Sequence, residues 1–230
     1  LGYLLIFQGR FDESEKELKA SLNIFNEMHH LHGQCQVWMK LVLHAIVMNN
    51  GNAAAEYAEM TENLMDEAKQ RGIARERDIV RSQWMLGAAK RLAFQIKGDS
   101  KYASAAERYL REAIRHSRIN NIMDHEPDIL LEMAKIKFLE SKQPENEKIG
   151  KKLLEEAKEL STEALEIAER CHYKLKQSDI HIFMSEFHLS VGNLEDAERN
   201  SETAKSLASC GYKPALQKAE TLAQMISGRR

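Results

Sequence analysis

The sequence is short of residues that interrupt helices, with only 3 prolines and 11 glycines in 230 residues. Alanine, leucine, glutamate and lysine are plentiful instead. Proline and glycine disfavour the interior of a helix, whereas these four residues favour it. The composition therefore predicts long helices joined by short connections.

Long apolar runs and a surplus of charge of one sign are also absent. The longest apolar stretch, Trp38 to Met48, is interrupted by Lys40 and His44, and it falls short of the roughly 18–20 residues that cross a bilayer. No signal peptide is recognisable. Lys and Arg number 33 against 35 Asp and Glu, without the basic stripe typical of proteins that bind nucleic acid. Neither a membrane nor a nucleic acid is expected as a partner.

Cysteine is rare as well. Cys35, Cys171 and Cys210 are odd in number and lack the CxxC spacing of metal or redox sites. Reduced thiols of this kind favour a cytoplasmic location. The chain starts at Leu1, within a helical pattern, so we expect it to be a fragment of a longer polypeptide.

What the sequence does contain is a helix-pair unit that recurs about five times. In its clearest copy, residues 181–208, an apolar helical pattern leads to a Gly-Asn turn, and a second helix with Ala at close-packing positions follows. Successive turns are about 42–48 residues apart, which is typical of helix pairs that stack on one another. The turn signals are Gly9, Asn50-Gly51, Gly98-Asp99, Pro144 to Asn146, and Gly192-Asn193.

The periodicity between these turns predicts the individual helices and repeats. Helices are expected near 1–8, 11–29, 34–49, 52–71, 75–97, 100–118, 126–141, 146–171, 175–191, 194–209 and 214–227. The polar segment from Ser141 to Lys148 is expected to be a loop. We predict a single domain over 1–230, with repeats near 1–31, 34–72, 75–120, 126–172 and 175–210 and a capping helix at 214–227.

Three of the copies share a small residue in the first helix, a glycine before the turn, and a large apolar residue soon after it. The matching residues are Leu1-Gly2, Gly9 and Phe11; Leu86-Gly87, Gly98, Tyr102, Ala105 and Tyr109; and Met184-Ser185, Gly192, Leu194, Ala197 and Ala204. Ser14 and Ser21 of the first copy stand where Ala is usual. This pattern resembles the tetratricopeptide repeat (TPR) family in a long-period form. The resemblance implies an all-α, right-handed superhelix whose first helices line a concave surface.

A narrower resemblance concerns the last sixty or so residues. The segment from Ala168 to His181, which contains Cys171 to Lys174, and the later segment from Cys210 to Pro214 resemble C-terminal repeat arrays of bacterial multidomain signalling (STAND-type) ATPases. This resemblance implies the sensing or regulatory arm of a larger signalling protein. Gly150-Lys151-Lys152 lacks the other residues of a phosphate-binding loop, so an ATPase module would lie outside this chain.

No group of residues has the pattern of a catalytic or metal site. His29, His30 and His32 have no adjacent carboxylate, and they are better explained by a favourable position at the end of a helix. His181 and His188 share one helix face without HExxH spacing, and we expect them to pack half-buried. The sequence therefore predicts no enzyme, no catalytic residue, no cofactor and no metal.

The candidate partner-binding residues lie on the first helix of each pair, which the resemblance places on the concave face. Faces that mix Trp with Arg are typical of protein interfaces. The alternative is that Trp38 and Trp84 pack between repeats. The candidates are Trp38, Leu41, Met48, Arg81, Trp84, Arg91, Asp128, Lys135, Asp179 and Glu186.

These observations favour a protein-interaction module that presents a concave groove to a peptide or protein partner. Two other functions stay open. The array could be a sensor that binds a small molecule or peptide, or a scaffold that associates with itself.

Overall fold

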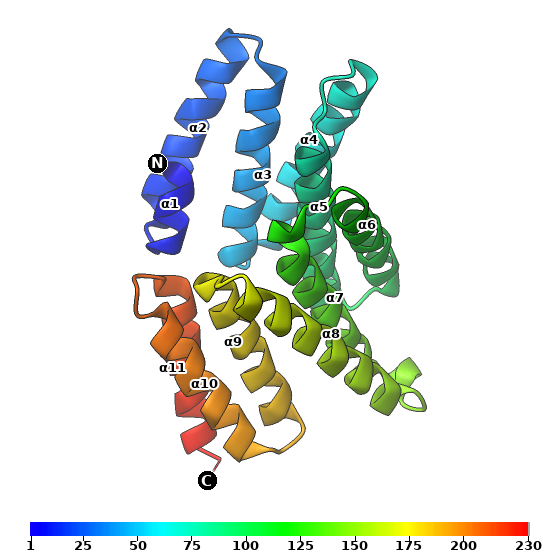
Figure 1. Cartoon of the computed structure of the whole chain (residues 1–230), viewed down its shortest axis with the longest axis vertical. Helices are drawn as coiled ribbons and strands as arrows, with labels where there is room; N and C mark the ends of the chain where they lie inside the picture. Colours follow the sequence, from blue (N-terminus) through cyan, green and yellow to red (C-terminus); the bar gives the residue numbers. More distant parts are fainter. Residues whose placement is uncertain (230) are drawn as a thin grey trace. The chain divides into compact units, whose positions relative to one another are not determined.

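The computed structural model describes residues 1–229, and every regular element in that range is helical (Figure 1). The predicted all-α class is confirmed. No helix of the described residues has the length and apolar character that crossing a membrane requires. The helices are α1 (Gly2–Phe7), α2 (Phe11–Glu27), α3 (Leu31–Val47), α4 (Gly51–Gln70), α5 (Glu76–Lys97), α6 (Ser100–Ile119), α7 (Glu126–Glu140), α8 (Gly150–Arg170), α9 (Lys174–Ser190), α10 (Leu194–Ala208) and α11 (Lys213–Ser227), with short 3₁₀ segments η1 (Met123–His125) and η2 (Pro144–Asn146).

Side chains cap the starts of α3, α4, α6 and α10. Asn50 Oδ1 accepts from the Ala53 amide at 3.1 Å, and Asn193 Oδ1 accepts from the Asp196 amide at 3.2 Å. Such caps satisfy an amide that has no partner within the helix. His30 Nδ1 does the same for the Gly33 amide at 3.0 Å. This histidine cap starts α3 at Leu31, three residues before the predicted start.

The chain divides into two compact units. Unit 1 consists of Leu1–Ile6 and Arg10–Glu132, and unit 2 of Phe7–Gly9 and the residues from Met133 onward. The division falls inside α7. Both units lie within the span predicted as one repeat domain.

In unit 1, helices α2 to α6 pack as successive antiparallel neighbours, and α3 also contacts α5 directly (Figure 1). Gly87 allows α5 to approach α6 closely. A Cβ atom at this position would lie 2.6 Å from Leu110 Cγ, and Leu110 is fully buried. The Leu86-Gly87 pair of the repeat pattern is therefore a close-contact position between two helices.

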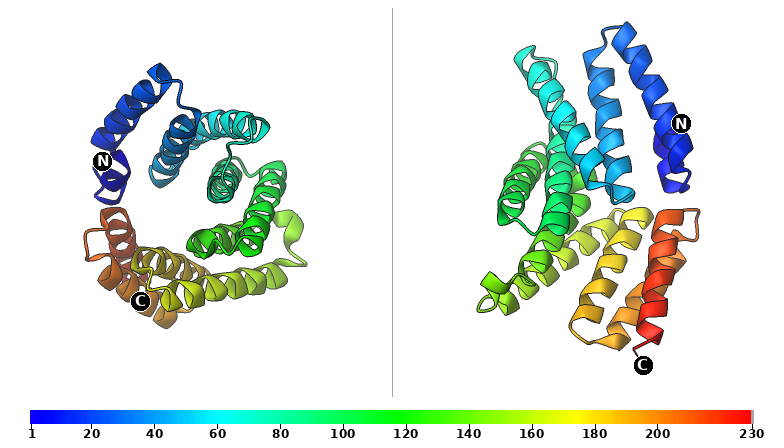
Figure 2. Two further views of the ribbon diagram at one scale, coloured as in Figure 1. Left: turned by 45° about the horizontal axis from the view of Figure 1, so that its top comes forward. Right: turned by 180° about the vertical axis from the view of Figure 1, so that it is seen from behind.

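In unit 2, α9 packs against α8, α10 and α11, as Figure 2 shows from behind for α9, α10 and α11. Buried alanines hold these helices close together: Ala197, Ala204, Ala208, Ala215 and Ala219. Between them, serine hydroxyls donate to carbonyl oxygens of the neighbouring helix. The bonds join Ser178 to Ala204 at 3.0 Å, Ser185 to Ala197 at 2.8 Å and Ser201 to Ala219 at 2.9 Å.

The three cysteines are free thiols and differ in exposure, and this difference gives a test of the packing. Cys35 is buried in α3, whereas Cys210 is exposed. Burial, with a smaller contribution from Asp78, raises the pKa of Cys35 to about 11. Because the thiolate is the reactive form, we expect iodoacetamide at a pH of about 8 to alkylate Cys210 and to leave Cys35 unmodified. Mass spectrometry of the native and the urea-unfolded chain measures this, and rapid native labelling of Cys35 would contradict the packing of α3.

Candidate functional site

Arg81 of α5 contacts α3 and the 3₁₀ segment η1, which precedes α7, in unit 1. Its Nη1 donates to Gln36 Oε1 of α3 at 2.9 Å, and its Nε donates to His125 Nε2 of η1 at 3.3 Å. The two partners lie 45 residues before and 44 residues after Arg81, close to the spacing between the predicted turns. We call Gln36, Asp78, Arg81, Trp84, His125 and Asp128 the Arg81 cluster.

The indole of Trp84 stacks on the imidazole of His125, with centroids 5.3 Å apart and planes 27° apart. His125 Nε2 accepts a hydrogen bond from Arg81, so in the neutral ring the proton belongs on Nδ1. That Nδ1 and Trp84 Nε1 are buried atoms with no hydrogen-bond partner in the described part of the chain. Buried polar groups are usually paired, so this stacked pair departs from the norm.

The carboxylates around Arg81 contact other groups as well, and Asp78 Oδ2 is a further buried atom with no hydrogen-bond partner in the described residues. Asp78 accepts from Gln36 Nε2 and lies 3.3 Å from His32 Nδ1. Asp124 Oδ2 lies 3.6 Å from Arg77 and 3.7 Å from His125.

Asp128 Oδ2 lies 4.0 Å from His125 Nδ1. Burial, followed by the charge of Asp128, raises the pKa of Tyr3 on α1, and the charge of Arg81 opposes this shift. The phenol of Tyr3 is therefore in the electrostatic field of the Arg81 cluster.

Three of the predicted partner-binding residues, Arg81, Trp84 and Asp128, belong to this cluster. The candidates on α3 lie elsewhere. Trp38 packs on Tyr57 with ring centroids 5.5 Å apart, and Leu41 is only 1 % exposed within the core. Met48, which is 46 % exposed, follows the end of α3.

The face of α3 that meets Arg81 carries Gln36 and, one turn later, Lys40. The residues predicted on α3 therefore lie on a different face of this helix from the one that meets Arg81. Residues four apart lie on the same side of a helix, so a set chosen around Trp38 does not include the residues that meet Arg81.

Arg91 was also a predicted partner-binding residue, but it lies in the core of unit 1. Its Nε donates to Glu132 Oε2 at 2.8 Å, and both side chains are only 8 % exposed. Its Nη1 donates to Gln95 Oε1 at 2.8 Å. These contacts leave Arg91 inaccessible to a partner. Its side chain points from α5 to α7 rather than to solvent.

The remaining candidates lie in unit 2. Lys135 is half-buried on α7, and Glu186 is exposed on α9. Asp179 accepts hydrogen bonds from the Tyr212 hydroxyl at 2.9 and 3.0 Å. Tyr212 is buried and Asp179 is half-buried, so this pair connects α9 with the start of α11.

Sequence reasoning did not single out Gln36 and His125, which contact Arg81. A signal for both was present, because a shift of 45 or 44 residues from Arg81, close to the spacing of the predicted turns, leads to them.

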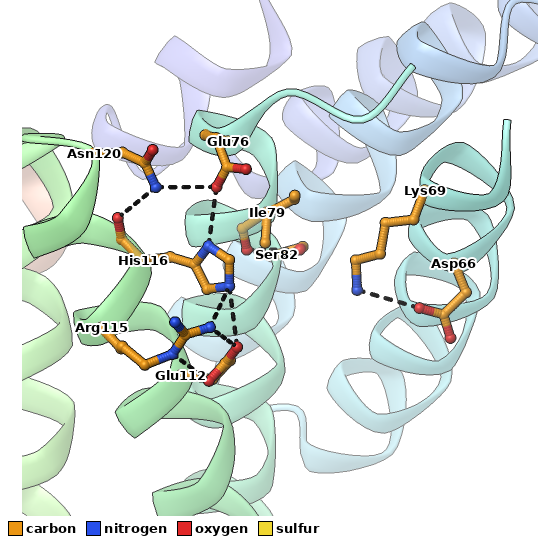
Figure 3. Close-up of polar contacts among 9 residues, drawn as sticks. All are labelled: Asp66, Lys69, Glu76, Ile79, Ser82, Glu112, Arg115, His116 and Asn120. Atoms are coloured by element: carbon orange, nitrogen blue, oxygen red, sulfur yellow. Dashed lines mark hydrogen bonds and ion pairs between the residues drawn. The ribbon is translucent and has the colours of Figure 1, made fainter. Parts of the chain in front are cut away.

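A second polar network joins α5 to α6 in unit 1 (Figure 3). His116 Nδ1 contacts Glu76 at 2.9 Å, and His116 Nε2 contacts Glu112 at 3.0 Å. Asn120 donates to Glu76, and the hydrogen bond from Arg115 is the main cause that lowers the pKa of Glu112 to about 2. The side chains of this network contact one another across the two helices, so it is best explained as a link between them.

Unit 1 also has an open cleft of about 910 Å³ between α4 and the second half of α5. Residues 51–63 of α4 form one wall, and residues 86–97 of α5 with Tyr102 form the other. The α4 wall carries Glu56 and Glu59, and the α5 wall carries Lys90 and Lys97. Within residues 1–229, no group of three or more His, Cys, Asp or Glu side chains could hold a metal ion.

Comparison with known proteins does not identify a family. No protein-family model matches the chain. A search of the curated proteins also finds no match. Function is therefore inferred from the helical fold and from the Arg81 cluster.

Proposed function

We propose that this chain is a non-enzymatic protein-interaction module of the TPR type, a right-handed superhelix of about five helix pairs that binds a peptide or protein partner. The observation that carries the proposal is the contact of Arg81 and Trp84 on α5 with His125 of η1, the 3₁₀ segment that precedes α7. Trp and Arg are the residues most enriched among those that dominate binding energy. A cluster of this kind on adjoining helices offers a preformed surface, so little ordering is needed when a partner binds.

The proposal further places the chain in the sensing or regulatory arm of a larger cytoplasmic signalling protein. What supports this part is the resemblance of the segments around Cys171 and Cys210 to the repeat arrays of such proteins. In the structure, these segments are the turns that precede α9 and α11.

The test compares two double variants of the whole chain. Arg81→Ala with Trp84→Ala removes the proposed contacts, and Arg170→Ala with Tyr173→Ala removes an exposed arginine and an aromatic residue in unit 2 as a matched control. A protein captured by the wild-type chain is purified and titrated by calorimetry. We expect the first variant to lose about 2 kcal/mol or more of binding free energy and the control to lose none, with equal helicity by circular dichroism. Equal binding by both variants would contradict this function.

A second function, a small-molecule sensor, is favoured by the cleft between α4 and α5. Its volume of about 910 Å³ is within the range of about 300–1,000 Å³ typical of ligand sites. Ala55 is exposed and lines this cleft, so Ala55→Phe would fill it without changing the core. A metabolite that raises the melting temperature of the wild type but not of Ala55→Phe would establish the sensor function.

A further inference from the structure

The cleft between α4 and α5 is long enough to hold a segment of helix. Its two walls, residues 51–63 of α4 and 86–97 of α5, each extend for about 17 Å, or roughly three helical turns. Small side chains line it: Ala55, Ala58, Ala89 and Ala93. Because these side chains end at Cβ, they leave the space between the two helices unfilled.

One end of the cleft exposes apolar side chains. Met48 is 46 % exposed and Ile96 is 54 % exposed, and both line the cleft. They belong to the same end, because a Cβ atom at Gly51, three residues after Met48, would lie 2.5 Å from Ile96 Cδ1. Exposed apolar side chains gathered in a concave site are typical of surfaces that bind a partner. Met48 is also one of the residues that the sequence predicted to bind a partner.

The two sides of the cleft carry opposite charges. Glu56 and Glu59 lie on the α4 side, and Lys90 and Lys97 lie on the α5 side. Within residues 1–229, none of these four side chains forms an ion pair. The two kinds of charge are therefore separated by the cleft rather than paired across it.

On the α4 side the negative charge is not neutralised by the chain itself. The hydrogen bond from Lys19 of α2 to Glu15 raises the pKa of Lys19, and Glu56 adds a minor contribution. Lys19 is thus paired with Glu15, at 2.7 Å, rather than with Glu56. Glu62, a third carboxylate of this side, accepts a hydrogen bond from the Tyr109 hydroxyl. Glu56 and its neighbour Glu59 are exposed and accessible to a partner.

On the α5 side the charge stays positive. Lys97 Nζ lies 3.3 Å from the Tyr102 hydroxyl, which is a neutral group. Asp99, the acidic residue nearest to Lys97 in the sequence, is paired with Lys101 at 2.8 Å. Lys90 is half-buried. A bound segment would therefore meet carboxylates on one side and ammonium groups on the other.

We propose that this cleft binds an amphipathic helix of a partner protein. The apolar stripe of that helix packs on Met48 and Ile96. Basic residues on one edge of the helix face the α4 side, and acidic residues on its other edge face the α5 side. A helix is the occupant that fits a cleft of about three turns with an apolar base and charged rims, and the rim charges set its orientation more than its affinity.

The proposed surface is separate from the Arg81 cluster. From Trp84 to Ala93 is about two and a half turns of α5, so the cleft lies on the opposite side of this helix from Trp84. The proposal therefore goes beyond the protein-binding function above, and it gives the cleft a protein segment as its ligand in place of a small molecule.

The experiment uses three alanine-based helical peptides that share one leucine stripe. The first carries Lys on one edge of the stripe and Glu on the other, the second carries Lys on both edges, and the third carries Glu on both edges. Binding to the whole chain is measured by fluorescence anisotropy at low salt. We expect the first peptide to bind about fivefold or more tightly than the other two. This preference should shrink in about 1 M NaCl, where the Debye length is about 3 Å.

Charge reversals then assign each edge of the peptide to one side of the cleft. Glu56→Lys with Glu59→Lys makes both sides basic, so this variant is expected to prefer the peptide with Glu on both edges. Lys90→Glu with Lys97→Glu makes both sides acidic, and its preference should move to the peptide with Lys on both edges. Circular dichroism of each variant checks that it folds.

Two further variants serve as controls. Asp12→Lys with Glu27→Lys reverses two exposed charges of α2, away from the cleft, and is expected to keep the preference of the wild type. Ala55→Phe fills the cleft and is expected to lose binding of all three peptides.

The outcomes separate this proposal from the functions above. Equal binding of the three peptides, or charge reversals that leave the preference unchanged, would overturn the placement of the helix between the two charged sides. Binding that survives Ala55→Phe but is lost in Arg81→Ala with Trp84→Ala would overturn the cleft as the site and would support the Arg81 cluster instead. Absence of binding by every peptide, together with a metabolite that stabilises the wild type but not Ala55→Phe, would overturn the helix as occupant and leave the sensor function standing.

Discussion

Replacing Arg91 by methionine is expected to lower the free energy of unfolding of unit 1 by about 3–5 kcal/mol. Methionine keeps most of the length of the side chain but leaves the carboxylate of Glu132 without the 2.8 Å contact that compensates its charge. Both members of the pair are only 8 % exposed, so water cannot replace the lost partner. The cost comes from losing this contact at a carboxylate that stays buried.

A double variant tests this explanation. Arg91→Met with Glu132→Leu removes both charges, and we expect it to recover most of the lost stability, because apolar replacement of a buried ion pair is often neutral. Lys69→Met breaks the exposed pair between Lys69 and Asp66 and should leave the unfolding midpoint unchanged. Trp38 and Trp84, both in unit 1, report urea unfolding by fluorescence. A single variant as stable as the wild type would show that Arg91 and Glu132 do not form a buried pair.

The second large effect is expected at Gly87, where valine should lower the stability of unit 1 by about 1–3 kcal/mol or more. The added Cβ would lie 2.6 Å from Leu110 Cγ and 3.3 Å from the Ala106 carbonyl oxygen. Neither atom can move easily, because Leu110 is fully buried and the carbonyl belongs to the backbone of α6. Replacing a glycine within a helix would normally stabilise the helix. A loss of stability would therefore indicate that the added side chain collides with α6.

Two comparisons test this contact at Gly87 by urea unfolding. Ala20→Val introduces the same branched side chain at an exposed position of α2 and is expected to have a small effect. Gly87→Ala and Leu110→Ala are each expected to destabilise unit 1, but together they should cost less than the sum of the single changes, because the shortened residue makes room for the added methyl group. Additive costs would indicate that the two positions do not touch.

The helices could be predicted closely because their boundaries are local. Asn50 and Asn193 cap the helices that follow them, and Gly98 and Gly192 adopt positive φ at the ends of the helices before them. These residues act on amides and carbonyls a few positions away, so they can be recognised without knowing the fold. The cap formed by His30 was missed because histidine rarely has that role.

The Arg81 cluster could be predicted only in part, for a different reason. Arg81 and Trp84 stand out by residue type, but the face of α3 that meets them depends on how that helix is rotated about its axis. The candidate residues of α3 were chosen on the face that carries Trp38, but in the structure the ring of Trp38 packs against Tyr57. The partner of Arg91 lies 41 residues away on α7, and such a pairing depends on packing that no local pattern records.

The serine hydroxyls of unit 2 have a mechanical consequence. Ser178, Ser185 and Ser201 each bond to a carbonyl of the neighbouring helix at a position where alanines hold the backbones close. A hydroxyl bond of this kind fixes the angular setting of a helix as well as its distance from the next, because rolling about the helix axis would break it. We therefore expect α9, α10 and α11 to resist rotation about their own axes relative to one another. Deformation among these three helices is expected at their connecting turns instead.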